Sequence, residues 1–367
     1  MRVLFRADAG AFIGAGHVMR CLALAEAVQE LGGEASFAAA SLPPALEERL
    51  RSAGIAVYRI GADPGSAADL AATRAVAEEA AVSAVVLDGY GFGERWRAGL
   101  AETGLPVLAF DDVGTGEPIH AGLIVNAAPD AGRLPYRIGN PDARLLLGPA
   151  YAPLRREVRE AAAAPKPPLE ERRSLLVTFG GSDPLGLTAP VIECLAPKLP
   201  PGVRLDVAVG GAVQDAGAVE AVAGRFKDSV RMHRDTPRMG HLMAQAGLAV
   251  SAAGTTTGEL AAVGTPAVLV TIADNQLEAA RQSEALGWCA LVAGQTDGAA
   301  ERIAAMALDL WADPARRRVM AGKLAGIVDG QGAVRIARAL LEAATIADEY
   351  PSPAPGEGRG PRHAREG

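Results

Sequence analysis

A histidine follows a glycine-bearing loop near the start of the chain. This loop, residues 7–17, reads Ala-Asp-Ala-Gly-Ala-Phe-Ile-Gly-Ala-Gly-His. Gly14 and Gly16 allow the backbone to approach a ligand closely, and the free N–H groups of the helix that follows attract an anion. The helix dipole disfavours a positive charge at this end, so we expect His17 to be neutral near pH 7 and to act as a general base. A turn without a ligand and a histidine that only packs are the alternatives.

Two further loops of this kind occur in the second half of the chain. One carries Gly180, Gly181 and Ser182 directly after an apolar run, and residues 251–260 form the other. Each loop lies between a predicted strand and a predicted helix, where backbone N–H groups are free to bind phosphate. Three such loops in one chain favour a phosphorylated ligand over three ordinary capped turns.

The second of these loops has the residue types that a nucleoside diphosphate requires. Gly254, Thr255 and Thr256 offer donors for the diphosphate. Glu259 follows Thr255 by one helical turn, so we expect it to accept hydrogen bonds from a ribose diol. Further polar side chains follow other apolar runs and complete the candidate rim: Asp88, Tyr90, the pair Asp111-Asp112, Asn275 and Gln276.

Other kinds of site find little support in the sequence. The histidines lack metal-ligand spacing, so we expect no protein-bound metal and no cofactor. A Gly-Lys-Ser/Thr element is absent, which excludes a Walker P-loop. The first loop lacks the third glycine of a dinucleotide fingerprint, and no acidic residue ends the second predicted strand, which argues against a nicotinamide-dependent oxidoreductase.

The elements that position these residues alternate along the chain. A helix with apolar residues at i, i+3, i+4 and i+7 spans 18–31 and ends at Gly32-Gly33. Alternation of strand and helix indicates a parallel sheet whose ligands bind at the carboxyl ends of the strands. The predicted strands are 3–5, 35–38, 56–60, 84–87, 107–110, 123–125, 175–179, 205–209, 248–251 and 267–271.

Composition sets the scale of the molecule. The 367 residues are 49% apolar and 22% charged, with 36 Lys and Arg against 43 Asp and Glu, a net charge of −7. This balance argues against a nucleic-acid or anionic-membrane binder. Three dispersed cysteines, no apparent leader and no long apolar stretch predict a cytoplasmic protein without a membrane span. The expected division is 1–160, a linker at 161–173, a nucleotide-binding unit at 174–345 and a disordered tail at 346–367.

A set of segments spread over about residues 1–340 points to one family. These segments are Arg6–Asp8, Gly14–Leu22, Asp88–Tyr90, Asp111-Asp112, Leu147–Tyr151 with Leu154-Arg155, Phe179–Pro184, Ser251–Glu259, Ala273–Gln276, and Asp329-Gly330 with Gly332-Ala333. Taken in chain order, they resemble the UDP-2,4-diacetamido-2,4,6-trideoxy-β-L-altropyranose hydrolase (PseG) family of pseudaminic acid biosynthesis, which supplies a nonulosonic acid for flagellin glycosylation.

The resemblance implies an α/β protein of GT-B fold, akin to MurG, with two Rossmann-like domains facing each other across a cleft. It implies water attack at the anomeric carbon of a UDP-linked sugar, without a metal, and His17 as the catalytic base. Tyr90 and Asn275 are expected near the reacting sugar, and Arg155 and Glu259 are expected to contact substrate. The C-terminal domain is expected to hold the nucleotide.

Three other functions compete with this expectation. A GT-B glycosyltransferase shares the nucleotide-binding half and passes the sugar to an acceptor other than water. A nucleotide-sugar binding protein without catalysis predicts that replacing His17 leaves UDP affinity intact with no turnover to lose. A nicotinamide-dependent oxidoreductase is the third and the least supported, because its fingerprint is incomplete.

Overall fold

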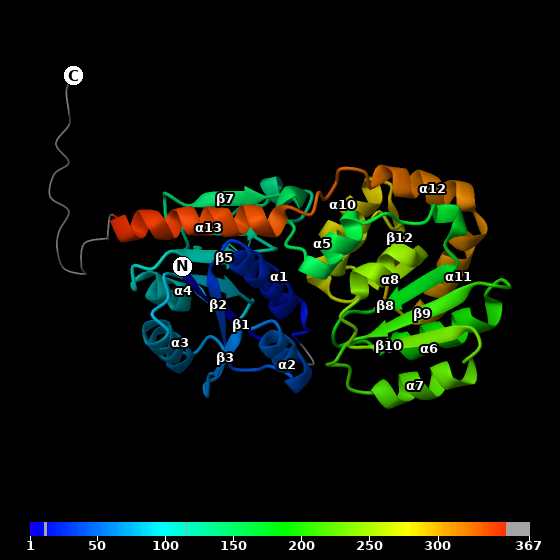
Figure 1. The fold of residues 1–367 in the computed structure, drawn as a ribbon, viewed down its shortest axis with the longest axis horizontal. Helices are drawn as coiled ribbons and strands as arrows, with labels where there is room; N and C mark the ends of the chain where they lie inside the picture. The colour runs from blue at the N-terminus through cyan, green and yellow to red at the C-terminus, as the bar shows by residue number, and fades with distance from the viewer. Residues whose placement is uncertain (11–12, 115, 350–367) are drawn as a thin grey trace, which may run out of the picture.

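Two parallel sheets, each covered by helices on both faces, organise the chain in the computed structural model (Figure 1). The structure describes residues 1–10, 13–114 and 116–349. The first sheet has seven strands in the order β3-β2-β1-β4-β5-β6-β7. Their bounds are β1 (Arg2–Ala7), β2 (Glu34–Ala39), β3 (Ala56–Arg59), β4 (Ala84–Asp88), β5 (Val107–Phe110), β6 (Leu123–Asn126) and β7 (Arg144–Leu147).

The second sheet has six strands in the order β10-β9-β8-β11-β12-β13. Their bounds are β8 (Ser174–Thr178), β9 (Arg204–Val209), β10 (Val230–Arg234), β11 (Ala246–Ala252), β12 (Ala267–Thr271) and β13 (Cys289–Ala293). In both sheets the chain order reverses beside the first strand, next to β1 and next to β8. Such a reversal leaves a crevice at the carboxyl ends of the strands, where α/β proteins bind ligands.

Helices cover the first sheet on both faces because its strands are apolar on both. Val3 and Phe5 of β1 are buried on one face with α1 (Gly16–Glu30) and α2 (Pro44–Ser52). Leu4 is buried on the other face with α3 (Ala67–Glu79) and α4 (Glu94–Ala101). Successive side chains of a strand alternate between faces, so a continuous apolar run fills two cores at once.

The second sheet is covered in the same way. One core lies under α6 (Thr188–Leu195), α7 (Ala216–Arg225) and α11 (Ala299–Ala312). The other lies under α5 (Arg156–Ala163), α8 (Met239–Gln245), α9 (Thr256–Val263) and α10 (Leu277–Ala285). The helix α12 (Pro314–Lys323) contributes Met320 to the first of these cores. Short 3₁₀ turns lie at Ala131–Arg133, Pro149–Tyr151, Leu169–Glu171, Ala196–Lys198 and Asp274–Gln276.

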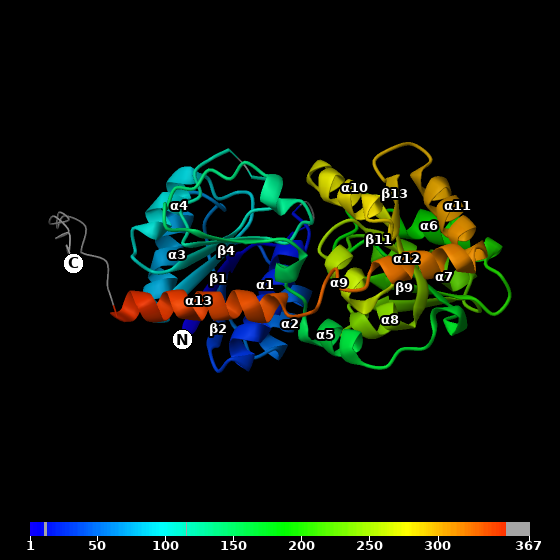
Figure 2. The same cartoon turned by 90° about the horizontal axis from the view of Figure 1, so that it is seen from above.

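The last helix, α13 (Gly332–Glu349), returns to the first sheet. In Figure 2 it runs along the lobe that contains β1 and β2, after the chain has crossed over from α12. Ile336 and Leu340 are fully buried in the core that α1 shares. The sequence analysis assigned this helix to the second unit, whereas the structure packs it on the first. We therefore call the first sheet with α1–α4 and α13 the N-terminal lobe, and the second sheet with α5–α12 the C-terminal lobe.

The strands expected from the sequence all occur, with bounds that differ by one or two residues. Three further strands, β7, β10 and β13, were not predicted, and each is an edge strand of its sheet. An edge strand has one neighbour, so it needs no long apolar run. The tail expected at 346–367 lies outside the described residues from 350 onward, and 346–349 complete α13.

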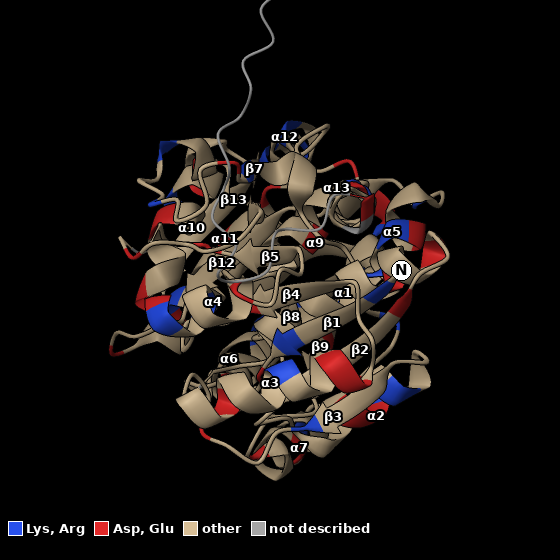
Figure 3. Cartoon of the chain, turned by 90° about the vertical axis from the view of Figure 1, so that its left-hand side faces the viewer, with Lys and Arg blue, Asp and Glu red and all other residues tan. Residues whose placement is uncertain are grey.

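Charge is mixed on the surface of the molecule. On the face in Figure 3, acidic and basic segments are interspersed over the helices. Among the helices of the described residues, none is both long and apolar enough to cross a membrane.

Candidate functional site

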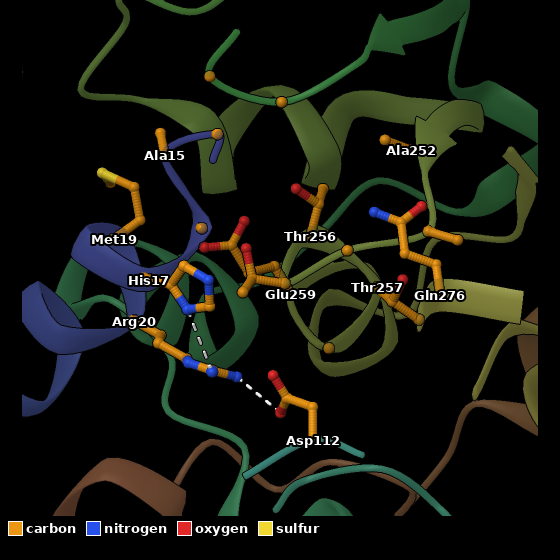
Figure 4. A pocket seen from close by; sticks show the side chains of 18 of the residues that line it. Ala15, His17, Met19, Arg20, Asp112, Ala252, Thr256, Thr257, Glu259 and Gln276 are labelled. Atoms are coloured by element: carbon orange, nitrogen blue, oxygen red, sulfur yellow. Dashed lines mark hydrogen bonds and ion pairs between the residues drawn. The ribbon is translucent and has the colours of Figure 1, made fainter. Parts of the chain in front are cut away.

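A cavity of about 1080 Å³ lies between the two lobes, at the carboxyl ends of both sets of strands. Figure 4 shows part of its lining, with residues from both lobes. The residues predicted from the sequence to catalyse or to bind all line this cavity: Gly14, Gly16, His17, Tyr90, Arg155, Gly180, Gly181, Ser182, Gly254, Thr255, Thr256, Glu259, Asn275 and Gln276. Asp111, predicted at the rim beside Asp112, is not among the lining residues. The roles assigned to them remain predictions.

The glycine-bearing loops of the two lobes meet beside the cavity. A Cβ atom on Gly181 would lie 2.3 Å from the Cβ of Ala15, which is closer than two carbon atoms can approach. A Cβ on Gly16 would meet the methyl group of Thr255 at 3.7 Å. Gly181 is therefore required by contact between the lobes, in addition to any ligand.

His17 lies in the first turn of α1 and binds a buried carboxylate. Its Nδ1 is 2.7 Å from Oδ1 of Asp88, the last residue of β4. The Asp88 side chain is fully buried, and Arg20 donates to both of its oxygens at 2.5 and 2.7 Å. An ionised carboxylate can only accept hydrogen bonds, so Nδ1 of His17 carries the proton. Nε2 is therefore free to take a proton from a reacting group.

The helix dipole was expected to disfavour a charge on His17, but the buried carboxylate of Asp88 acts on its pKa in the opposite direction. Burial lowers the pKa of His17, but the charge and the hydrogen bond of Asp88 outweigh burial and raise it above its ordinary value of 6.5. Burial alone would raise the pKa of Asp88, yet Arg20 and His17 hold it well below its usual range. A full charge in hydrogen-bond contact thus dominates the partial charge of a helix end.

A hydrogen bond joins the two lobes over the cavity. Asn275 of the C-terminal lobe donates from Nδ2 to the Tyr90 hydroxyl at 3.0 Å. The Tyr90 hydroxyl is 3.0 Å from Asp112, and its ring meets the His17 ring edge-on with centroids 4.9 Å apart. Asp111, beside Asp112, instead accepts from two backbone N–H groups of its own turn. The two adjacent carboxylates thus take different partners and form no dyad.

Glu259 pairs with Arg155 inside the cavity. Arg155 donates from Nε to Oε1 of Glu259 at 2.8 Å, and both side chains are about 10% exposed. A second carboxylate, Glu157, lies 3.2 Å from the same guanidinium. Glu259 thus makes an ion pair, and the ribose contact expected of it from the sequence stays a prediction.

On the side of the C-terminal lobe, the cavity lies near the beginnings of α6, α9 and α10. Asp183 accepts from the N–H groups of Leu187 and Thr188 at 2.9 Å and so caps α6. The side chain of Gln276 accepts from the N–H of Ile272, which fixes the turn before α10. The Thr257 hydroxyl, in the first turn of α9, is buried without a hydrogen-bond partner. In the described part of the chain, no group of three or more His, Cys, Asp or Glu side chains is arranged to hold a metal ion.

The sequence placed Asp88 and Asp112 at the candidate rim, but it gave Arg20 no role and did not identify the contacts among His17, Arg20 and the two carboxylates. Arg20 follows His17 by three residues, which places both on one face of α1. Asp88 directly follows the predicted strand 84–87, and that strand pairs with the first one in the sheet. Knowing that the two strands are neighbours would have placed Asp88 beside His17. Nothing in the spacing connects Asp112 to Arg20.

Comparison with known protein families gave no matching family model. The chain is 35% identical over 205 residues to the UDP-N-acetylglucosamine–N-acetylmuramyl-(pentapeptide) pyrophosphoryl-undecaprenol N-acetylglucosamine transferase of Methylobacterium nodulans, covering 52% of this chain and 54% of that protein. It is 31% identical over 237 residues to the transferase of the same name from Methylobacterium radiotolerans, covering 60% and 59%. The chain thus spans 54% to 59% of the length of these two relatives.

Solved structures share the fold over nearly the whole chain. MurG of Acinetobacter baumannii superposes with a TM-score of 0.59 at 18% identity, over 93% of this chain and 99% of that one. The spinosyn rhamnosyltransferase SpnG superposes with a TM-score of 0.60 at 18% identity, over 92% and 100%. These similarities confirm the predicted GT-B fold, with two Rossmann-like lobes facing each other across a cleft.

Proposed function

We propose that this chain is an enzyme that transfers the glycosyl group of a UDP-sugar in the cleft between its lobes. The observation that carries the proposal is the His17–Asp88 pair, which lines the same cavity as the glycine-bearing loops of the C-terminal lobe. The relatives support the same class, because two of them are N-acetylglucosamine transferases by name.

In this proposal the UDP group lies against residues 174–331 and the sugar faces residues 1–160. Backbone N–H groups at Gly180 and Gly181 and at the start of α9 stabilise the diphosphate charge that grows as the anomeric C–O bond breaks. The acceptor hydroxyl attacks the anomeric carbon, and Nε2 of His17 takes its proton. The products are the glycosylated acceptor and UDP, and a single displacement inverts the anomeric configuration.

The acceptor distinguishes two versions of this function. The names of the relatives favour a hydroxyl group on a second substrate. Water is the second candidate, because Tyr90 stands edge-on to His17 and bonds Asn275 across the cleft. A bulky acceptor would have to displace this pair, whereas water would not. With water as acceptor, we propose as substrate the one that the motif resemblance implies, a UDP-linked 2,4-diacetamido-2,4,6-trideoxyhexose of pseudaminic acid biosynthesis.

Release of UDP tests the proposal and separates the versions. The purified chain is incubated with a panel of UDP-sugars, including UDP-N-acetylglucosamine and the UDP-diacetamido sugar, with and without candidate acceptors. Release without an acceptor identifies a hydrolase, and release only with an acceptor identifies a transferase. We expect His17→Ala to abolish release while UDP still binds, and His241→Ala, an exposed position on α8 outside the cavity, to behave as wild type. No release from any UDP-sugar would refute the proposal.

A further inference from the structure

A series of hydrogen bonds leads from the C-terminal lobe toward His17. Asn275 donates to the Tyr90 hydroxyl at 3.0 Å, and that hydroxyl donates to Oδ2 of Asp112 at 3.0 Å. The other oxygen of Asp112 accepts from Arg20 at 2.8 Å. The carboxylate of Asp112 therefore binds both Tyr90, which contacts the opposite lobe, and Arg20, which lies beside the imidazole of His17.

Arg20 is held on several sides. Two of its nitrogens contact Asp88, and a third contacts Asp112, as Figure 4 shows for the latter pair. Its guanidinium also lies over the ring of Phe110, 4.6 Å from the centroid. A planar guanidinium in two-point contact fixes the plane of a carboxylate. Because Asp88 holds Nδ1 of His17, the orientation of Arg20 also determines that of the imidazole.

We propose that Arg20 and Asp112 are positioning residues that transmit the closure of the two lobes to His17. Asn275 fixes the Tyr90 hydroxyl, and this hydroxyl and Arg20 together engage both oxygens of Asp112. When the lobes separate, the bond between Asn275 and Tyr90 is lost, so Tyr90 holds Asp112 with one restraint fewer. The base is then aligned only when the nucleotide lobe has closed over it. This inference rests on the proposed function only for its effect on turnover.

The charged groups around the imidazole set the sign of the expected change. The carboxylates of Asp88 and Asp112 raise the pKa of His17, and the guanidinium of Arg20 lowers it. Loss of the Asp112 charge removes one influence that favours the imidazolium and leaves Arg20 less neutralised, so both effects lower the pKa. Two neutral titratable groups face the same cluster: the Tyr90 phenol, and the Cys21 thiol 3.7 Å from Asp88.

Nitrogen-15 NMR of the histidine side chains in the full chain tests the inference without substrate. We expect Asp112→Asn to lower the pKa of His17, because one of the two carboxylates that raise it is lost. Arg20→Lys keeps the charge but loses the two-point contact, so the Nε2–H tautomer should gain population. Asp142→Asn, an exposed carboxylate of the same lobe, is the control and should change neither. Unchanged pKa and tautomer in both cluster variants would overturn the inference.

Two further measurements serve as a control for folding and as a test of the connection between the lobes. The signals of the histidines outside the cavity, at positions 120, 233 and 241, report whether each variant is folded. A double-mutant cycle of Asn275→Ala and Asp112→Asn on the active UDP-sugar tests the connection between the lobes. We expect kcat of the double variant to be no lower than that of the worse single variant, because both break one chain of contacts. Additive losses would refute transmission between the lobes, whereas a lack of turnover on every UDP-sugar would refute the proposed function and leave the NMR result to decide.

Discussion

At the residue scale, His17 depends on a carboxylate that lies 71 residues further along the chain. Asp88 stays ionised because Arg20 contacts both of its oxygens inside a buried site. The pairing keeps the proton on Nδ1 and raises the pKa of His17, so the imidazole is a stronger base than a free one. It is also protonated over a wider range of pH, which lowers the fraction of active base at mildly acidic pH.

We predict that Asp88→Asn lowers kcat and moves the acidic limb of kcat/KM to lower pH. A general base acts in its deprotonated form, so the limb follows the pKa of His17, which lies above 6.5 in the native protein. Removing the carboxylate lowers that pKa and releases the tautomer, which we expect to cost roughly 10²–10⁴-fold in kcat. The measurement is the pH profile of UDP release.

The chain offers a matched control for this variant. His233 and Asp206 form a second His–Asp pair, with Nε2 and Oδ1 2.9 Å apart, in the C-terminal lobe outside the cavity. Asp206→Asn breaks a comparable contact and should leave the position of the limb unchanged. An acidic limb at the same pH in Asp88→Asn and the native chain would contradict the assignment of His17 as the base.

At the element scale, the sequence specifies some parts of the site better than others. Continuous apolar runs such as that of β8 predicted the central strands, because a strand buried on both faces must be apolar throughout. The three glycine-bearing loops followed from these strands, and all of them line one cavity. The contact of His17 with Asp88 did not follow, because it depends on strand order rather than on spacing along the chain.

The placement of α13 shows the same limit. Its apolar stripe predicts a buried face but does not specify which sheet buries it. Ile336 and Leu340 complete the core that α1 shares, about 300 residues from it in sequence. The last helix therefore packs on the N-terminal lobe and stabilises it.

We predict that Leu340→Ala lowers the free energy of unfolding by about 2–5 kcal/mol, because it removes a fully buried side chain from the core of the N-terminal lobe. Ile346→Ala on the same helix is the control: its side chain is 61% exposed, so the change should stay within about 0.5 kcal/mol. Urea denaturation followed by circular dichroism measures both. Equal effects of the two substitutions would show that α13 is not docked on the N-terminal lobe in solution.

At the scale of the whole molecule, the lobes are joined by ion pairs of Arg156 and Arg159 in α5 with Glu30 in α1, and by two further contacts beside the cavity. Asn275 bonds Tyr90 at one position. At the other, Arg49 of α2 contacts the carboxylate of Asp235 at 2.7 Å and the carbonyl oxygen of the same residue at 2.9 Å. The closed arrangement of the lobes is thus held by a neutral hydrogen bond, Asn275 to Tyr90, near His17, and by the ion pair of Arg49 with Asp235.

The ion pair predicts how the lobes respond to substitution and to nucleotide. Arg49→Ala should shift the equilibrium toward separated lobes by about 1 kcal/mol, a factor of about five, because partly exposed ion pairs rarely contribute more. Small-angle X-ray scattering should then give a larger radius of gyration without UDP and the native value with saturating UDP, since a ligand bound between the lobes favours the closed state. Arg51→Ala, which breaks only the ion pair with Glu47 in the same helix, should scatter as the native chain does. Identical scattering from Arg49→Ala and Arg51→Ala without UDP would mean that the contact with Asp235 does not hold the lobes together.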